Sequence, residues 1–311
     1  MTVTTQPTEF DVHDQHFLRC VDTTARLEIL YTGCRFGEGP AYFPAQRSLI
    51  WSDIPNDRML RFDETSQEVG VFRSPSRFAN GNTRDNEGRL VTCEQGTRSV
   101  VRTEHSGART VLADTYQGRR LNSPNDVVVG PDGSIWFSDP TYGIDSDYEG
   151  NLGESEIGAA NVYRVVPSTG ETVLAADGFV QPNGLALSAD GSSLYAVDSG
   201  FTHDPDGPRH IRRFTVEPAA TLSGGEAIAE CDQGIFDGLR LDADGRIWTS
   251  AGDGVRCLAP DGRPLGSIRV PEVVSNVEFG GQKLNELYIT GASCLYRIRV
   301  SVNGARVTRH W

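Results

Sequence analysis

Six side chains that carry amide or carboxylate oxygens occupy the same position of an internal repeat. In four copies this residue lies seven positions before a turn residue, in the first copy it precedes the run at Pro40, and in the last copy the alignment slips by one residue. The six residues are Glu38, Asn80, Asn125, Asn183, Asp237 and Asn276. Such oxygens, with no His or Cys in the set, are typical ligands of Ca²⁺ or Mg²⁺. The pattern therefore predicts one divalent-cation site, and the larger, more flexible ligand shell of Ca²⁺ suits it best.

A purely structural reading of these residues is the alternative. Asn and Asp often cap turns at the start of a strand, because their side chains hydrogen-bond to nearby backbone groups. Turn capping does not account for a glutamate, Glu38, at the same position of the first copy. We therefore favour the cation site, and we expect replacement of Asn276, which belongs to the slipped copy, to have a mild effect.

Short strands have to bring these residues together. Runs rich in β-branched and aromatic residues recur at intervals of about 40 to 59 residues, which suits the blades of a propeller. Their first residues are Leu49, Arg89, Ile135, Leu194, Ile247 and Leu287. Each run follows another strand and a tight turn, often Asp-Gly, and precedes two more strand-like runs. Four antiparallel strands in six copies predict an all-β fold, a six-bladed β-propeller.

The same pattern predicts how the ring closes. The run from Arg26 to Leu30 resembles a strand that completes the last blade, so that no sheet edge stays open. We expect residues 1–20 to form a polar N-terminal tail and residues 21–311 to form a single propeller domain. Innermost strands line the central channel, so the six oxygen-bearing residues should meet at one mouth. Trp51, Trp136 and Trp248 fall at equivalent strand positions and are predicted to lie in the blade core.

Composition limits the classes of partner. A net charge of −13 repels phosphate backbones and anionic lipids. No segment approaches the ~18 uninterrupted apolar residues of a membrane span, and the six cysteines have neither zinc nor disulfide-framework spacing. We expect a soluble, cytoplasmic monomer or homodimer with buried free thiols, and no nucleic-acid or membrane partner.

Five motifs, in order along residues 30–300, resemble those of the gluconolactonase and senescence-marker-protein-30 (regucalcin-like) family. They are Gly37-Glu-Gly-Pro, Asn122-Ser-Pro-Asn-Asp, Ile135-Trp-Phe-Ser-Asp-Pro-Thr-Tyr-Gly, Gln181-Pro-Asn-Gly and Phe236-Asp-Gly-Leu. The second and third motifs look most like the bacterial gluconolactonase branch. The resemblance implies a six-bladed propeller with a divalent metal, usually Ca²⁺, that hydrolyses sugar lactones and related esters.

The resemblance also implies site residues. By motif, Glu38, Asn183 and Asp237 would be direct metal ligands, and Asn125 would complete the site or contact the substrate. Ca²⁺ is the expected cofactor, with Mg²⁺, Zn²⁺ or Mn²⁺ as alternatives. Ser123 stands where animal members of the family have an arginine, so their mode of sugar binding does not carry over.

Hydrolysis of a small-molecule lactone such as D-glucono-1,5-lactone is the expected reaction. A cation polarises the lactone carbonyl, and because Ca²⁺ is a weak Lewis acid we expect Asp237 to act as general base on the attacking water. Asn80, Asn125, Asp139 and Tyr142 are the expected substrate contacts. Two alternatives are a non-catalytic propeller that binds Ca²⁺ or another ligand, and a phosphotriesterase-type hydrolase on the same fold.

Other catalytic motifs do not occur. The sequence has no G-x-S-x-G elbow, H-E-x-x-H, P-loop or G-x-G-x-x-G. The long connection from Thr141 to Ala160 carries five acidic residues, for which a solvated loop is the simplest interpretation. A lid over the channel, or a second and weaker Ca²⁺ site, is the alternative for this loop.

Overall fold

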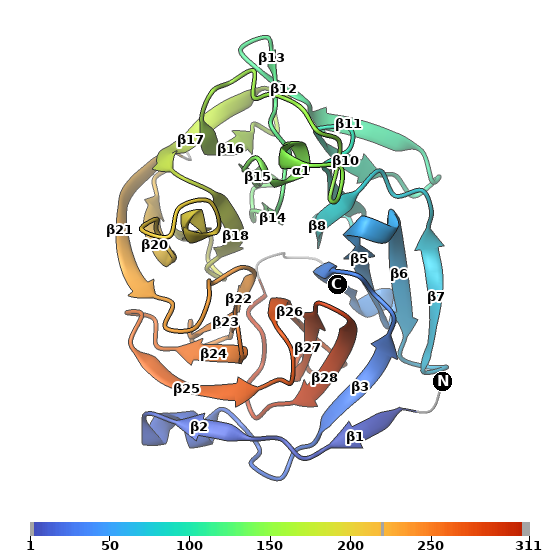
Figure 1. Ribbon diagram of the computed structural model, residues 1–311, viewed down its shortest axis with the longest axis vertical. Coiled ribbons are helices and arrows are strands. Elements are labelled where there is room, and N and C mark those ends of the chain that lie inside the picture. The colour runs from blue at the N-terminus through green and yellow to red at the C-terminus, as the bar shows by residue number, and fades with distance from the viewer. Residues whose placement is uncertain (1–2, 219–220, 307–311) are drawn as a thin grey trace.

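Six β-sheets surround a central axis in the computed structural model (Figure 1), which describes residues 3–218 and 221–306. Each sheet has a core of four antiparallel strands, and consecutive strands of a blade are neighbours in its sheet. The predicted six-bladed β-propeller is confirmed. The strand runs identified in the sequence form the second strand of each blade, with starts that agree to within one residue.

The first three blades follow directly along the chain. Blade 1 consists of β4 (Gly37–Phe43), β5 (Ser48–Asp53), β6 (Arg58–Asp63) and β7 (Glu68–Arg73). Blade 2 consists of β8 (Ala79–Arg84), β9 (Leu90–Glu94), β10 (Ser99–Thr103) and β11 (Arg109–Ala113). After the hairpin of β12 (Thr115–Tyr116) and β13 (Arg119–Arg120), blade 3 consists of β14 (Val127–Val129), β15 (Ile135–Asp139), β16 (Ala160–Val165) and β17 (Thr172–Phe179).

The remaining blades complete the circle. Blade 4 consists of β18 (Pro182–Leu187), β19 (Ser193–Asp198), β20 (His210–Val216) and β21 (Leu222–Glu230). Blade 5 consists of β22 (Leu239–Leu241), β23 (Ile247–Ala251), β24 (Gly254–Leu258) and β25 (Pro264–Arg269). Blade 6 consists of β26 (Val274–Gly280), β27 (Glu286–Gly291), β28 (Cys294–Arg299) and, from the N-terminal part of the chain, β3 (Leu27–Thr32).

The N-terminal part of the chain closes the ring. As predicted, β3 is the outer strand of blade 6, where it pairs with β28. The sequence predicts a polar tail for residues 1–20, whereas the structure adds β1 (Thr4–Gln6) to β3 and β2 (Phe10–Val12) to β25. These short edge strands are held by backbone hydrogen bonds, so they need no alternating apolar pattern that a sequence would reveal. Phe17, in the 3₁₀ helix η1 (Gln15–Arg19), is fully buried with its ring centroid 6.4 Å from that of Trp248.

Apolar side chains fill the spaces within and between blades. Trp51, Trp136 and Trp248 are at most 1% exposed, which confirms their predicted place in the core. All six cysteines are free thiols, and five of them are buried. None of the helices within residues 3–218 and 221–306 is long and apolar enough to cross a membrane.

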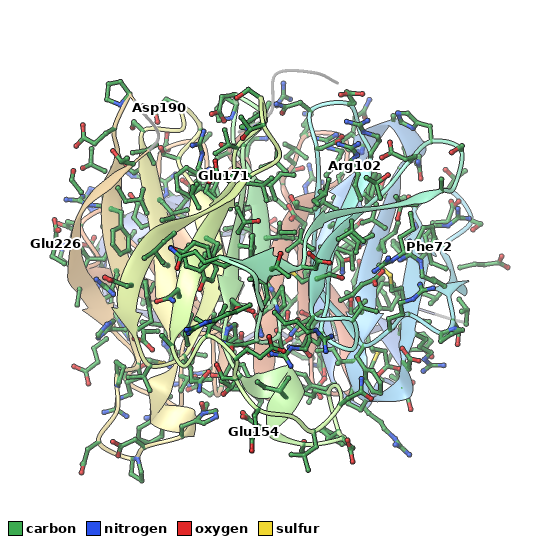
Figure 2. The ribbon with its side chains drawn as sticks, turned by 90° about the horizontal axis from the view of Figure 1, so that it is seen from above. Phe72, Arg102, Glu154, Glu171, Asp190 and Glu226 are labelled. Carbon is green, nitrogen blue, oxygen red and sulfur yellow. The ribbon has the colours of Figure 1, made fainter. Side chains whose placement is uncertain are left out.

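Two short helices mark one mouth of the channel. They are α1 (Tyr142–Asp145), which follows β15, and η4 (Gly200–Thr202), which follows β19. Figure 2 shows the two ends of the propeller: Glu154, in the loop that follows α1, lies at the opposite end from Asp190, in the turn between β18 and β19. We call the end that carries α1 the helix mouth.

Candidate functional site

The six repeat-position residues stand where the innermost strands begin, at the helix mouth. Glu38, Asn80, Asn183 and Asn276 lie within the first three residues of their strands, and Asn125 and Asp237 lie two residues before theirs. Five of the six are buried, and Asp237 is partly exposed. In the four blades where the residue is part of the strand, the strand pairing shifts register beside it. Such bulges redirect side chains, here at the mouth of the channel.

Glycines that follow the repeat-position residues let neighbouring blades approach closely. A Cβ atom on Gly184 would lie 2.0 Å from the backbone oxygen of Asp237, and one on Gly238 would lie 1.9 Å from Cγ of Asn276. Gly39 and Gly81 make the same close approach to the next blade. Any other residue would therefore force the blades apart, so the Glu-Gly, Asn-Gly and Asp-Gly pairs hold the ring of oxygens together.

Glu38 has one carboxylate oxygen engaged and one unpaired. Its Oε2 accepts hydrogen bonds from the Gly39 N–H at 2.6 Å and from Nδ2 of Asn276 at 2.9 Å. Its Oε1 is buried without a hydrogen-bond partner, and Oδ1 of Asn80 is in the same condition. Burial raises the pKa of Glu38 to about 7. Unpaired buried oxygens are unusual in native proteins and suit a cation ligand.

Asn183 and Asp237 form the other half of the site. The Asn183 amide donates to Oγ of Ser199 at 3.1 Å, and Ser199 in turn donates to the Phe236 carbonyl at 2.9 Å. This chain orients the amide. The pKa of Asp237 is raised well above its usual range, first by burial of the carboxyl group and then by the charges of Glu38 and other carboxylates nearby, while a hydrogen bond from Asn183 opposes the rise.

The carboxylates of the site repel one another. Besides burial, the charges of Glu38, Asp126 and Glu149 raise the pKa of Asp237. The charges of Asp126 and Glu149 also raise the pKa of Glu38. Arg240 offsets part of this charge, because its guanidinium lies 3.9 Å from Asp126, but it also pairs with Glu278 at 2.9 Å. A divalent cation would relieve the remaining repulsion. Within residues 3–218 and 221–306 no group of three or more His, Cys, Asp or Glu side chains could hold a metal, so a cation here would depend on amide oxygens as well.

The repeat suggests that Asn276 offers its oxygen to a cation, but its amide is hydrogen-bonded within the protein. Its Nδ2 donates to Glu38, and its Oδ1 accepts from the Val277 N–H at 2.8 Å. Both ends of the amide are therefore engaged by the protein. Asn276 orients the Glu38 carboxylate, so the expectation that its replacement would be mild does not agree with this geometry.

The predicted substrate contacts are distributed unevenly. Asn80 and Asn125 lie at the mouth, and the Gly81 N–H donates to the Asn125 carbonyl at 2.8 Å. Asp139, by contrast, is 0% exposed, and its two oxygens accept from the N–H groups of Asn122 and Ser123, each at 2.8 Å. Burial raises the pKa of Asp139 to about 7. Asp139 thus holds the segment that leads to Asn125 and is not free to contact a substrate.

Tyr142, the fourth predicted contact, belongs to α1. Its hydroxyl lies 3.0 Å from Oγ1 of Thr202, and its ring centroid lies 5.4 Å from that of His203. His203 also pairs through Nε2 with Asp145 at 2.8 Å. These contacts join α1 to the loop that carries η4, so two connections from neighbouring blades meet at the helix mouth.

The acidic loop after α1 is largely solvated, as the simplest interpretation of the sequence predicts, with one exception. Asp145, Asp147, Glu154 and Glu156 are exposed, as expected for a solvated loop. Glu149 is different: burial raises the pKa of its carboxyl group to about 7, and its charge acts on Glu38 and Asp237. Sequence reasoning missed Glu149, because a run of acidic residues does not indicate which of them faces inward.

A cavity lies at the other end of the channel. Its volume is ≈ 130 Å³, and it is lined by the far ends of the innermost strands, including Tyr42, Arg84 and Glu278. None of the six repeat-position residues lines this cavity. The repeat-position residues therefore lie apart from this cavity, at the helix mouth.

Comparisons with known proteins identify the family to which the fold and the motifs are similar. Residues 36–293 match the family model described as SMP-30/Gluconolactonase/LRE-like region. The chain is 29% identical to a gluconolactonase of Zymomonas mobilis over 91% of this chain and 84% of that protein. A solved gluconolactonase structure from Xanthomonas campestris is 35% identical and superposes with a TM-score of 0.88, covering 96% of this chain and 97% of that one. A calcium-binding protein, regucalcin, from Agrobacterium tumefaciens shares the fold at 20% identity, with a TM-score of 0.74 over 91% of this chain and 96% of that one.

Proposed function

Because the chain belongs to the SMP-30/gluconolactonase/LRE-like family, we propose that it is a metal-dependent lactonase that hydrolyses a sugar lactone such as D-glucono-1,5-lactone to the aldonic acid. The observation that carries the proposal is the position of Glu38, Asn183 and Asp237 at one mouth, with an oxygen of Glu38 buried and unpaired. Relatives named gluconolactonase support the choice of substrate.

Glu38, Asn183 and Asp237 would hold the cation, with Asn125 as a fourth ligand. Their oxygens and the crowding of carboxylates favour a hard divalent cation, and Ca²⁺ is our first choice over Mg²⁺, Zn²⁺ or Mn²⁺. Such an ion, when bound, polarises a carbonyl and lowers the pKa of water. Asn276 keeps Glu38 in position, and Ser199 does the same for Asn183.

Asp237 is the general base in this proposal. Its carboxylate accepts a proton from water while the water oxygen bonds to the lactone carbonyl carbon. The ring C–O bond then breaks, and the departing ring oxygen takes the proton from Asp237, which becomes the hydroxyl proton of the aldonic acid and leaves Asp237 ionised again. Asn80, Asn125 and Tyr142 orient the lactone at the helix mouth. Partial exposure of Asp237 is consistent with access from solvent.

A lactone panel with chelator and metal add-back tests the function. Activity on D-glucono-1,5-lactone should vanish with chelator and return with Ca²⁺. At saturating metal, Asp237→Asn should remain about 10²- to 10⁴-fold slower than the wild type, because the variant keeps a ligand oxygen but loses the base. Glu154→Gln, an exposed site at the same mouth, is the control and should leave the rate unchanged.

Two results would overturn parts of the proposal. Cation binding without turnover of any lactone would indicate a binding protein, and turnover of a phosphotriester alone would indicate the related hydrolase chemistry. Wild-type rates for Asp237→Asn would remove the general-base role. The proposal includes a cytoplasmic location, which the six free thiols support.

A further inference from the structure

One buried side chain at the helix mouth has neither of its polar atoms paired. Gln95 is 1% exposed, and both its Nε2 and its Oε1 lack a hydrogen-bond partner. Among residues 3–218 and 221–306, Gln95 is the one side chain in which two buried polar atoms both lack a partner. A buried amide without partners lowers stability, so its presence here calls for a functional reason.

Gln95 lies beside the candidate site. It directly follows β9, and its backbone N–H donates at 3.1 Å to the carbonyl of Phe78, two residues before Asn80. Above it lies α1: a Cβ atom on Gly143 would be 2.6 Å from Cβ and 3.0 Å from Cδ of Gln95. The Gln95 side chain is therefore enclosed between the start of blade 2 and α1.

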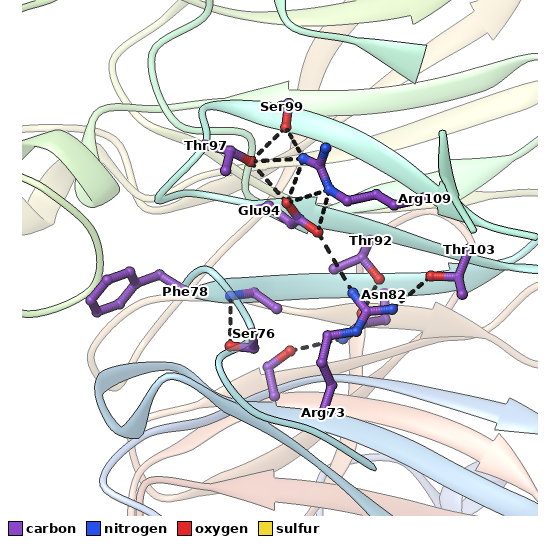
Figure 3. A network of polar contacts seen from close by, with 12 residues as sticks. Arg73, Ser76, Phe78, Asn82, Thr92, Glu94, Thr97, Ser99, Thr103 and Arg109 are labelled. Atoms are coloured by element: carbon purple, nitrogen blue, oxygen red, sulfur yellow. Dashed lines mark hydrogen bonds and ion pairs between the residues drawn. The ribbon is translucent and has the colours of Figure 1, made fainter. Parts of the chain in front are cut away.

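The backbone around Gln95 is firmly held. Figure 3 shows the carboxylate of the preceding residue, Glu94, between two arginines: Arg109 at 2.7 Å and Arg73 at 3.6 Å. Thr97 adds a hydrogen bond to the same carboxylate at 2.9 Å. A polar group on a rigid support can be preorganised for a ligand, because little order has to be gained on binding.

The backbone opposite Gln95 is strained. Arg77 and Phe78 have φ angles of +65° and +52°, a left-handed conformation that costs free energy in residues other than glycine. Their carbonyls accept the N–H groups of Gly96 and Gln95 at 3.0 Å and 3.1 Å. The fold thus accepts strain on one side of Gln95 and unpaired polar atoms within it, a combination typical of binding sites.

We propose that the Gln95 amide binds a hydroxyl group of the substrate, so that Gln95 selects polyhydroxylated lactones over unsubstituted ones. This inference rests on the proposed lactonase function. An amide offers a donor and an acceptor side by side, and a hydroxyl group both donates and accepts. A site built to hydrogen-bond a hydroxyl rejects an analogue that lacks it, because the protein groups then stay unpaired.

The chemistry of the two kinds of lactone differs at this amide. A sugar lactone carries several neighbouring hydroxyl groups, whereas an alkyl lactone would leave the Gln95 amide without partners.

The test compares Gln95→Leu with the wild type on D-glucono-1,5-lactone and on δ-valerolactone, its unsubstituted analogue, at saturating Ca²⁺. For gluconolactone kcat/KM should fall about 10- to 100-fold, while for valerolactone it should stay within about threefold. Product inhibition is a second readout. D-gluconate should inhibit the variant more weakly than it inhibits the wild type. By contrast, 5-hydroxyvalerate should inhibit the two proteins equally.

Gln181→Leu is the matched control for folding. Gln181 is also a buried glutamine at this mouth, but its amide is paired at both ends with Thr141, at 3.0 Å and 2.9 Å. Gln181→Leu should lower the melting temperature by several degrees, whereas Gln95→Leu should leave it unchanged or raise it.

Equal losses on both lactones, or a melting temperature that falls as far as in Gln181→Leu, would show that Gln95 is structural. A wild-type protein that hydrolyses neither lactone would instead overturn the lactonase function itself.

Discussion

Replacement of Asn276 by alanine tests whether cation affinity depends on the hydrogen bond that orients the Glu38 carboxylate. The amide of Asn276 donates to Oε2 of Glu38 at 2.9 Å inside the protein. A hydrogen bond to a charged group is worth about 1.5–3 kcal/mol, and ~1.4 kcal/mol corresponds to a tenfold change in an equilibrium constant. If the carboxylate loses this orientation, cation affinity should fall about 10- to 100-fold. This is more than the mild effect that the repeat pattern alone suggests.

Isothermal titration of Ca²⁺ into chelator-treated protein measures this effect directly. Asn161→Ala is a matched control, because Asn161 is buried and donates to the hydroxyl of Tyr163 at 3.0 Å, away from the repeat-position residues. The control should bind Ca²⁺ as the wild type does. An Asn276→Ala protein that is folded and binds Ca²⁺ within twofold of the wild-type affinity would refute the supporting role.

Three further predictions follow from the ring. Gly184→Ala should unfold at a clearly lower temperature and lose activity, because its Cβ would lie 2.0 Å from a backbone oxygen of the next blade, whereas Gly70→Ala, with open space at its Cβ, should not. In the presence of a chelator, the melting temperature should fall as the pH rises from about 4 to about 7. Burial raises the pKa of Glu38, Asp139 and Glu149 to about 7. The folded state therefore binds more protons than the unfolded state in this range, and it loses that advantage as the pH rises. A melting temperature that rises over that range would contradict the assignment. At pH 8, Ca²⁺ added to metal-free protein should raise the melting temperature, and an unchanged value would count against a tight site.

Much of the fold can be predicted from local patterns in the sequence. Strands with period-two alternation and Asp-Gly turns recur in phase, and the phase marks the residues that reach the channel, such as Asn183 and Asp237. The strand β3 was identified because it has a clear β pattern and a ring needs a partner for its last blade. By contrast, β1 and β2 are three residues each, and their place depends on backbone pairing with distant strands.

The functional site is harder to predict from the sequence, because the orientation of its side chains depends on the path of the loops. Glu149 is one of five acidic residues in a loop, and only the course of that loop decides that it is the one whose pKa burial raises to about 7. Gln95 is a single amide after a strand, and its interest comes entirely from the absence of partners in the described structure. A sequence shows which side chains are polar but not which of them are left unpaired.

The acidic residues at the helix mouth fall into two sets, which differ in whether the protein itself hydrogen-bonds both oxygens of the carboxylate. The second strands of four blades end in or close to a buried carboxylate, and in each case the protein itself engages the oxygens. These carboxylates are Asp53, Glu94, Asp139 and Asp198. Asp53 accepts from the Arg35 N–H at 2.8 Å, and Asp198 accepts from the Gln181 N–H at 2.9 Å.

Three of them, Asp53, Asp139 and Asp198, hold the segments that lead into the innermost strands. Glu38 lies at the same mouth and is almost as deeply buried, yet one of its oxygens has no partner. Burial of an unpaired carboxylate oxygen is costly, and a cation bound to Glu38 would offset that cost. Asp139 has both oxygens engaged by the protein, whereas Glu38 and Gln95 keep buried polar atoms that are unpaired, which is why we propose a cation for the first and a substrate hydroxyl group for the second.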